Sequence, residues 1–78
     1  MSGIAEWVRV RTLEDQARMA LDLALSASKT IRVYLDASFT PPDDMVSRFL
    51  AQYGEAERLY FEYLIAREAA EEAHDAAG

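Results

Sequence analysis

The chain has 78 residues, of which 51% are hydrophobic and 28% are charged, and its formal net charge is −6. This length predicts a single small domain, residues 1–78, and this composition is typical of a globular protein rather than a disordered one. The sequence has no cysteine and one histidine, which excludes disulfides, thiolate zinc sites and histidine-rich metal sites.

No apolar run approaches the roughly 20 residues that a membrane span needs. The segment Met1-Ser2-Gly3 lacks the basic and apolar regions of a signal peptide. The absence of cysteine fits the cytoplasm, so we expect a cytoplasmic protein that does not enter a membrane. Because a chain this short has a thin stability margin, we also expect a partner subunit, most simply a second copy in a homodimer.

Residues 6–11 and 30–35 alternate between apolar side chains and polar or charged ones. Val8 and Val10 share one side of the first segment, and Ile31, Val33 and Leu35 share one side of the second. Period-two alternation with β-branched residues is typical of strands, so both segments are predicted as β-strands.

Residues 12–28, between these segments, are predicted as a helix. Thr12 is a suitable N-cap, and Glu14 and Asp15 place negative charge at the positive end of the helix dipole. One face collects small and apolar residues at helical spacing: Leu13, Ala17, Ala20, Leu21, Ala24, Leu25 and Ser28.

A second interpretation of the first half is one continuous helix from about residue 4 to residue 38. It rests on a seven-residue repeat formed by Val10, Leu13, Ala17, Ala20, Ala24, Ala27, Ile31 and Tyr34. The favoured fold class is α+β, a small strand–helix–strand–long helix domain that forms a dimer. The alternative is an all-α helical hairpin.

The second half is predicted as one long helix from Pro41 to about His74. Thr40 would be its N-cap, Pro41 suits a first helical position, and Asp43 lies three residues after the cap. Gly54 interrupts the pattern without preventing a continuous or kinked helix. One apolar stripe is expected along this helix, made of Val46, Phe49 or Leu50, Tyr53, Ala56, Tyr60, Tyr63 or Leu64, and Arg67.

The segment Leu59–Ile65 holds the greatest bulk of large side chains in the chain. Only Glu62 within it is charged, and Arg58, four residues earlier, is its expected partner. Because a small alanine-rich helix cannot cover so much apolar surface, we predict a protein interface. The predicted interface residues are Tyr53, Leu59, Tyr60, Phe61, Tyr63, Leu64 and Ile65.

A second predicted partner-facing surface combines arginine with aromatic side chains, the residue types that dominate interface hot spots. If the two strands pair, they place on one face Trp7, Arg9, Arg11, Arg32 and Tyr34. Nucleic-acid binding is disfavoured because the chain is acidic and has no lysine patch.

No catalytic motif is present, and no cofactor or metal site is predicted. Glu71 and His74 have the Glu-x-x-His spacing of di-iron bundles, but the further carboxylates such sites need are missing. Residues 41–78 carry nine acids against three arginines, which supplies the whole net charge.

The sequence therefore predicts a non-catalytic protein-binding module, a regulator, adaptor or inhibitor, that acts through a dimeric helical and aromatic surface. The alternative is an acidic inhibitor of a nucleic-acid-binding complex, of the kind seen among phage or mobile-element accessory proteins. It would present carboxylates in place of phosphates, and its binding would depend strongly on salt.

Overall fold

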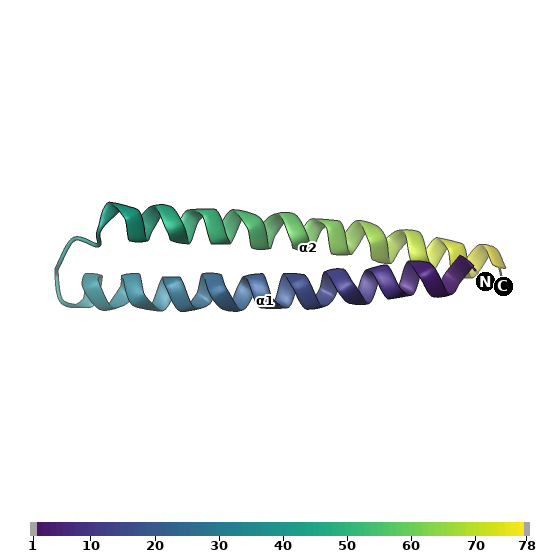
Figure 1. The fold of residues 1–78 in the computed structure, drawn as a ribbon, viewed down its shortest axis with the longest axis horizontal. Coiled ribbons are helices and arrows are strands. Elements are labelled where there is room, and N and C mark those ends of the chain that lie inside the picture. The colour runs from purple at the N-terminus through teal and green to yellow at the C-terminus, as the bar shows by residue number, and fades with distance from the viewer. Residues whose placement is uncertain (1, 78) are drawn as a thin grey trace.

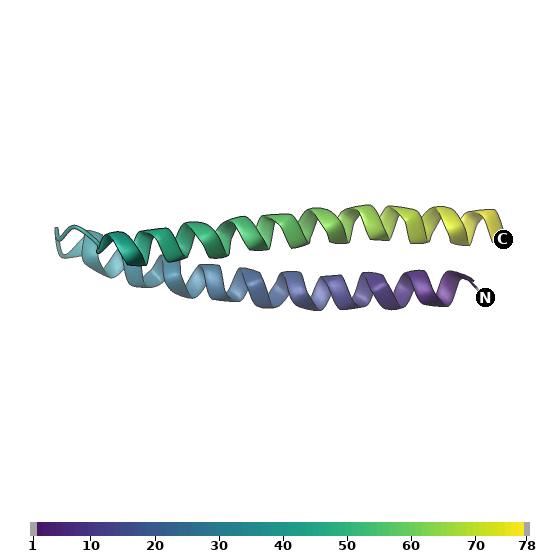
Figure 2. The same ribbon diagram turned by 45° about the horizontal axis from the view of Figure 1, so that its top comes forward.

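The chain folds into a hairpin of two long helices. The computed structural model describes residues 2–77, with α1 spanning Ser2–Asp36 and α2 spanning Asp43–Ala77. Each helix has 35 residues, and the two run antiparallel, side by side (Figure 1, Figure 2). The Cα atoms extend over 58 × 14 × 14 Å, so the hairpin is a rod with its loop at one end and both ends of the chain at the other.

The predicted α+β fold is wrong, because both predicted strands are helical and residues 2–77 contain no strand. The alternating valines fit a helix, since Val10 is buried between the helices while Val8 lies 61% exposed on the outside. Thr12, predicted as an N-cap, lies inside α1, where its hydroxyl donates a 2.9 Å hydrogen bond to the carbonyl of Val8. The Thr30 hydroxyl does the same toward Ser26 at 3.2 Å. The all-α hairpin, the alternative interpretation, is the observed fold.

The core follows one seven-residue repeat on each helix. On α1 the core positions are those of the predicted repeat, all buried or half-buried: Val10, Leu13, Ala17, Ala20, Ala24, Ala27, Ile31 and Tyr34. On α2 a matching repeat is likewise buried or half-buried: Phe49, Gln52, Ala56, Leu59, Tyr63, Ala66, Ala70 and Ala73. Alternating three- and four-residue spacing on both helices is the pattern of an antiparallel coiled coil. Alanine fills half of these positions, so the helices can pack closely without large side chains between them.

Helix α1 ends in a Schellman motif. The N–H of Phe39 donates to the carbonyl of Tyr34 at 2.8 Å, and the N–H of Ser38 donates to Leu35 at 3.0 Å. Ser38 has a φ of 63°, the left-handed conformation that this motif requires and that glycine adopts more easily. These bonds satisfy carbonyls at the end of α1 and turn the chain toward α2.

Helix α2 begins two residues later than predicted. The N–H groups of Met45 and Val46 both donate to the carbonyl of Pro42 at 3.1 Å, so Pro42 rather than Thr40 precedes the helix. The helix continues to Ala77, beyond the predicted end at about His74. It also continues through Gly54, which has open space where a Cβ would lie.

Candidate protein-interaction surface

Three open recesses lie in a row along one side of the hairpin, between α1 and α2. Their volumes are about 610, 270 and 240 Å³. On α1 they are lined by Trp7, Val10, Arg11, Glu14, Asp15, Ala17, Arg18, Leu21, Asp22, Ala24, Leu25 and Ser28. On α2 they are lined by Phe49, Tyr53, Tyr60, Tyr63, Arg67 and Glu71. Leu50 and Leu64 lie on the same side, because they precede Glu71 at intervals of seven residues. We call this surface the groove face.

Large apolar side chains on the groove face are exposed to solvent. Leu21, Leu25, Leu50, Tyr53 and Tyr60 each have between 47% and 60% of their surface exposed. The hairpin thus buries mainly small residues between its helices and leaves a row of leucines and tyrosines uncovered beside them. Contiguous exposed apolar surface of this kind marks an interaction site in soluble proteins.

Aromatic pairs give the α2 side of the groove face a fixed shape. The rings of Phe49 and Tyr53 have centroids 6.0 Å apart and planes tilted by 42°. Tyr60 and Tyr63 form a similar pair, also at 6.0 Å, with planes tilted by 38°. Both distances lie in the range favoured by aromatic pairs, so these rings support one another before any partner binds.

Four of the seven predicted interface residues lie on the groove face. Tyr53 and Tyr60 line its recesses, and Leu64 lies on the same side. Tyr63 lines two recesses but is half-buried against the core. The structure therefore brings these four side chains to one surface, together with leucines of α1.

The other three predicted interface residues lie elsewhere. Leu59 is only 9% exposed and belongs to the core between the helices. Ile65 lines a recess on the opposite side of the hairpin, with Arg9 and Glu62. Phe61 is 56% exposed on the side of α2 that points away from α1. The side chains of the apolar run Leu59–Ile65 thus point in four directions: to the groove face, into the core, to the opposite recess and away from α1.

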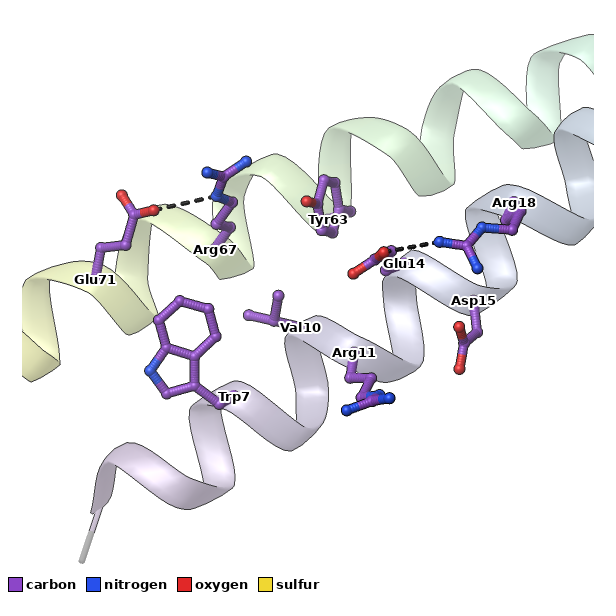
Figure 3. Close-up of a pocket in the computed structure, with 9 residues that line it drawn as sticks. All are labelled: Trp7, Val10, Arg11, Glu14, Asp15, Arg18, Tyr63, Arg67 and Glu71. Carbon is purple, nitrogen blue, oxygen red and sulfur yellow. Dashed lines mark hydrogen bonds and ion pairs between the residues drawn. The ribbon is translucent and has the colours of Figure 1, made fainter.

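The predicted surface of Trp7, Arg9, Arg11, Arg32 and Tyr34 does not exist as one face. It depended on paired strands, whereas in one helix Trp7 and Arg32 are separated by 25 residues, or about 37 Å. Trp7 and Arg11 do line the recess near the chain ends (Figure 3). Arg9 faces the opposite side, and Arg32 pairs with Asp36 at 3.6 Å near the loop.

The end of the groove face near the chain ends is charged. Arg18 binds Glu14 at 2.9 Å, and Arg67 binds Glu71 at 3.1 Å, one pair on each helix (Figure 3). The hydrogen bond to Glu71, followed by interaction with Tyr63, raises the pKa of the Arg67 guanidinium. Because these ion pairs are exposed, they contribute little to the stability of the fold. They do make this end of the groove face charged.

The opposite side of α2 has a polar network. Arg58 donates to Glu55 at 3.0 Å and to Glu62 at 2.7 Å, which confirms the predicted Arg58–Glu62 pair. The hydrogen bond from Arg58 lowers the pKa of Glu55, and the Glu55 carboxylate raises the pKa of Arg58. Ion pairs therefore occur on both sides of the hairpin, and the groove face differs in its exposed tyrosines, whereas Ile65 is the exposed apolar residue beside Glu62 on the opposite side.

Sequence reasoning missed that Leu21, Leu25 and Leu50 belong to an exposed surface. Leu21 and Leu25 were expected on the packed face of a short helix, and Leu50 on the main stripe of α2. The available signal was a second seven-residue repeat beside the first, with Leu21, Ser28 and Leu35 on α1.

Two further features are absent from residues 2–77, the part of the chain that the structure describes. That part of the chain contains no group of three or more acidic or histidine side chains placed to hold a metal ion. Neither α1 nor α2, as described, has a segment long and apolar enough to cross a membrane. No protein-family model, curated protein or solved structure matches this chain.

Proposed function

We propose that this protein is a non-catalytic protein-binding module of the cytoplasm that acts as a homodimer. Two hairpins pack groove face to groove face and form a four-helix bundle. The observation that carries the proposal is the exposed row of leucines and tyrosines beside an alanine-rich core. A four-helix bundle covers this row, whereas an isolated hairpin leaves it in water.

The size of the groove face fits a stable dimer. Two helices side by side, each about 10 Å wide, give a surface about 20 Å wide along the 58 Å rod. This is roughly 1,000 Å² from each copy, compared with the roughly 800 Å² per partner of a standard interface. The face also includes residues of both helices, so the same patch can serve both copies in a symmetric contact.

Charge also favours a second copy as the occupant. Three arginines line the recesses of the groove face: Arg11, Arg18 and Arg67. Four acids line them too: Glu14, Asp15, Asp22 and Glu71. These charges nearly balance, so most of the net charge of −6 lies on the other sides of the hairpin, and two groove faces do not repel each other strongly.

The acidic-inhibitor alternative has less support. Glu55, Glu62 and Glu71 of α2 are each held by an arginine of their own helix, which leaves fewer carboxylates to imitate phosphate groups. Binding to partner proteins by the dimer is then expected to depend on apolar contact. Such binding weakens little when salt is raised, whereas electrostatic mimicry weakens strongly.

Sedimentation equilibrium tests the proposal directly. The wild-type chain is expected to sediment at twice its mass of 8.8 kDa. Tyr53→Asp combined with Tyr60→Asp places two carboxylates on the groove face and is expected to give a monomer. Phe61→Asp is the matched control, because Phe61 points away from the groove face, and it is expected to remain dimeric.

Two results would count against the proposal. One is a wild-type chain that is monomeric at millimolar concentration. The other is a double variant that keeps both the dimeric mass and the helical circular dichroism of the wild type. The circular dichroism also separates loss of the dimer from loss of the fold.

A further inference from the structure

The groove face has two chemically different halves. The loop half, toward the connection between the helices, has leucines and aromatic rings around its recess, among them Leu21, Leu25, Phe49 and Tyr53. The terminal half, toward the chain ends, has the charged recess, which extends from Trp7 to Arg18 along α1 and is lined on α2 by Arg67 and Glu71 (Figure 3). When two hairpins pack through their groove faces, each half of one copy must therefore contact a half of suitable chemistry on the other copy.

Two symmetric arrangements bury the whole groove face. In one, the two loops lie at the same end of the bundle, so the loop half meets the loop half. In the other, the loops lie at opposite ends, so each charged half meets the apolar half of the other copy. The second arrangement removes charged groups from water against leucine and tyrosine, which is costly without compensating partners.

We infer that the two copies pack with their loops at the same end. This inference rests on the proposed homodimer and specifies how its interface is built. Loop halves then cover each other's apolar side chains. The terminal halves also meet each other, so the arginines and glutamates of one copy lie at the same level of the bundle as those of the other copy.

Both arrangements place facing helices antiparallel, and they differ in which helices and side chains face each other. A twofold axis along the rod places α1 of one copy over α2 of the other, and these helices run antiparallel, as they do within one hairpin. Each α2 terminal segment, with Arg67 and Glu71, then faces an α1 segment with Arg11 and Glu14. Opposite charges are therefore available across the contact as well as within each helix.

A staggered dimer that overlaps only through the loop halves buries too little surface. Half of the groove face is roughly 500 Å² from each copy, which is below the roughly 800 Å² per partner of a standard interface. Full overlap also covers Trp7, which is 41% exposed in the hairpin. The same-end arrangement alone gives full overlap without placing charge on the apolar half.

Distances between spin labels test the arrangement in the full chain. The sequence has no cysteine, so a single substitution gives one label per copy. Thr40→Cys labels the loop, and Asp75→Cys labels the opposite end of the rod, both at exposed positions. Met19→Cys, 67% exposed near the middle of α1 and outside the recesses, is the control, because its two labels stay within the width of the bundle in both full-overlap arrangements.

The expected result is a short distance, below about 30 Å, for both Thr40→Cys and Asp75→Cys, which is the scale of a bundle two helices thick. Distances near the 58 Å length of the rod at both positions would overturn the same-end arrangement and leave the homodimer standing. A monomeric mass for the unlabelled wild-type chain would overturn both. Sedimentation of each labelled variant checks that the label leaves the dimer intact.

Discussion

Two neighbouring stripes run along this hairpin, and they differ in the size of their side chains. The core stripe joins α1 to α2 largely through alanine, with residues such as Ala17, Ala56 and Ala70 almost fully buried. The groove-face stripe beside it has leucine and tyrosine, which remain half exposed. In an isolated domain the larger side chains would be expected inside, because they gain more from burial.

The proposed homodimer accounts for this reversal, because the hairpin would then be one layer of a four-helix bundle. Alanine in the core lets α1 and α2 lie close together, which makes the hairpin thin and its groove face flat. The large side chains are then available for a second layer. The comparison predicts that changes in the core stripe alter the stability of the hairpin, whereas changes in the groove face alter its association.

The largest effect on stability is expected from Leu59→Ala. Leu59 is a large core residue at 9% exposure, and truncation of such leucines typically costs about 2–5 kcal/mol of unfolding free energy. Urea unfolding at one fixed chain concentration measures it. Leu23→Ala, at a 58% exposed position outside the groove face, is the control and should cost well under half as much. Equal losses would show that the core stripe is wrongly placed.

Ala56→Leu tests the close approach of the helices. Ala56 is 1% exposed, so a leucine there must push α1 and α2 apart, and overpacking of this kind costs about 1–3 kcal/mol. Ala51→Leu makes the same chemical change at an exposed position of the same helix and should be nearly neutral. Thermal melts followed by circular dichroism compare the two. A stabilised Ala56→Leu would mean that the core has room that the structure does not show.

The seven-residue repeat of α1 was a better guide to its packing than the period-two alternation at its two ends. The repeat from Val10 to Tyr34 predicted every core position of α1 in this region. The error came from Val8, Val10 and Val33, whose β-branched side chains favour strands only when a sheet is there to receive them. Packing between two helices outweighed this weak local preference, as tertiary contacts often do.

The prediction for α2 merged two stripes into one. Bulk drew attention to Tyr53, Tyr60 and Leu64, which lie on the groove face, and away from Ala66 and Ala70, which lie in the core. A search for the largest apolar residues cannot separate a core stripe from an interface stripe when the core is made of alanine. The prediction of an interface at Tyr53, Tyr60 and Leu64 remains to be tested by the sedimentation experiment.

Gly54→Ala is expected to have a smaller, stabilising effect. Gly54 lies in the interior of α2, outside the core and the groove face, and a Cβ there meets nothing within 4 Å. Alanine in a helix interior is favoured over glycine by roughly 0.5–1 kcal/mol. Urea unfolding should show this gain, with an unchanged mass in sedimentation. A loss of stability or of the dimer would mean that a second chain approaches the backbone at this position.

The smallest effect concerns the polar side of the hairpin, opposite the groove face. The Arg58 hydrogen bond lowers the pKa of Glu55 from 4.5, so this pair stabilises the folded state above the unfolded pKa. The contribution is lost as the pH falls below about 4.5 and passes through the lowered pKa of the folded state. Because the pair is exposed, the change in melting temperature is expected to be small.

Glu55→Gln isolates this contribution, because it keeps the size of the side chain and removes its titration. Melting temperature measured from pH 7 down to pH 3 should fall slightly less in the variant than in the wild type. Raising the salt concentration should narrow the difference, since exposed ion pairs are screened. If melting temperature depends on pH in the same way in both proteins, the ionised Glu55 carboxylate adds no stability through Arg58. In that case the Arg58 network would be a solvated surface that adds little to the stability of the hairpin.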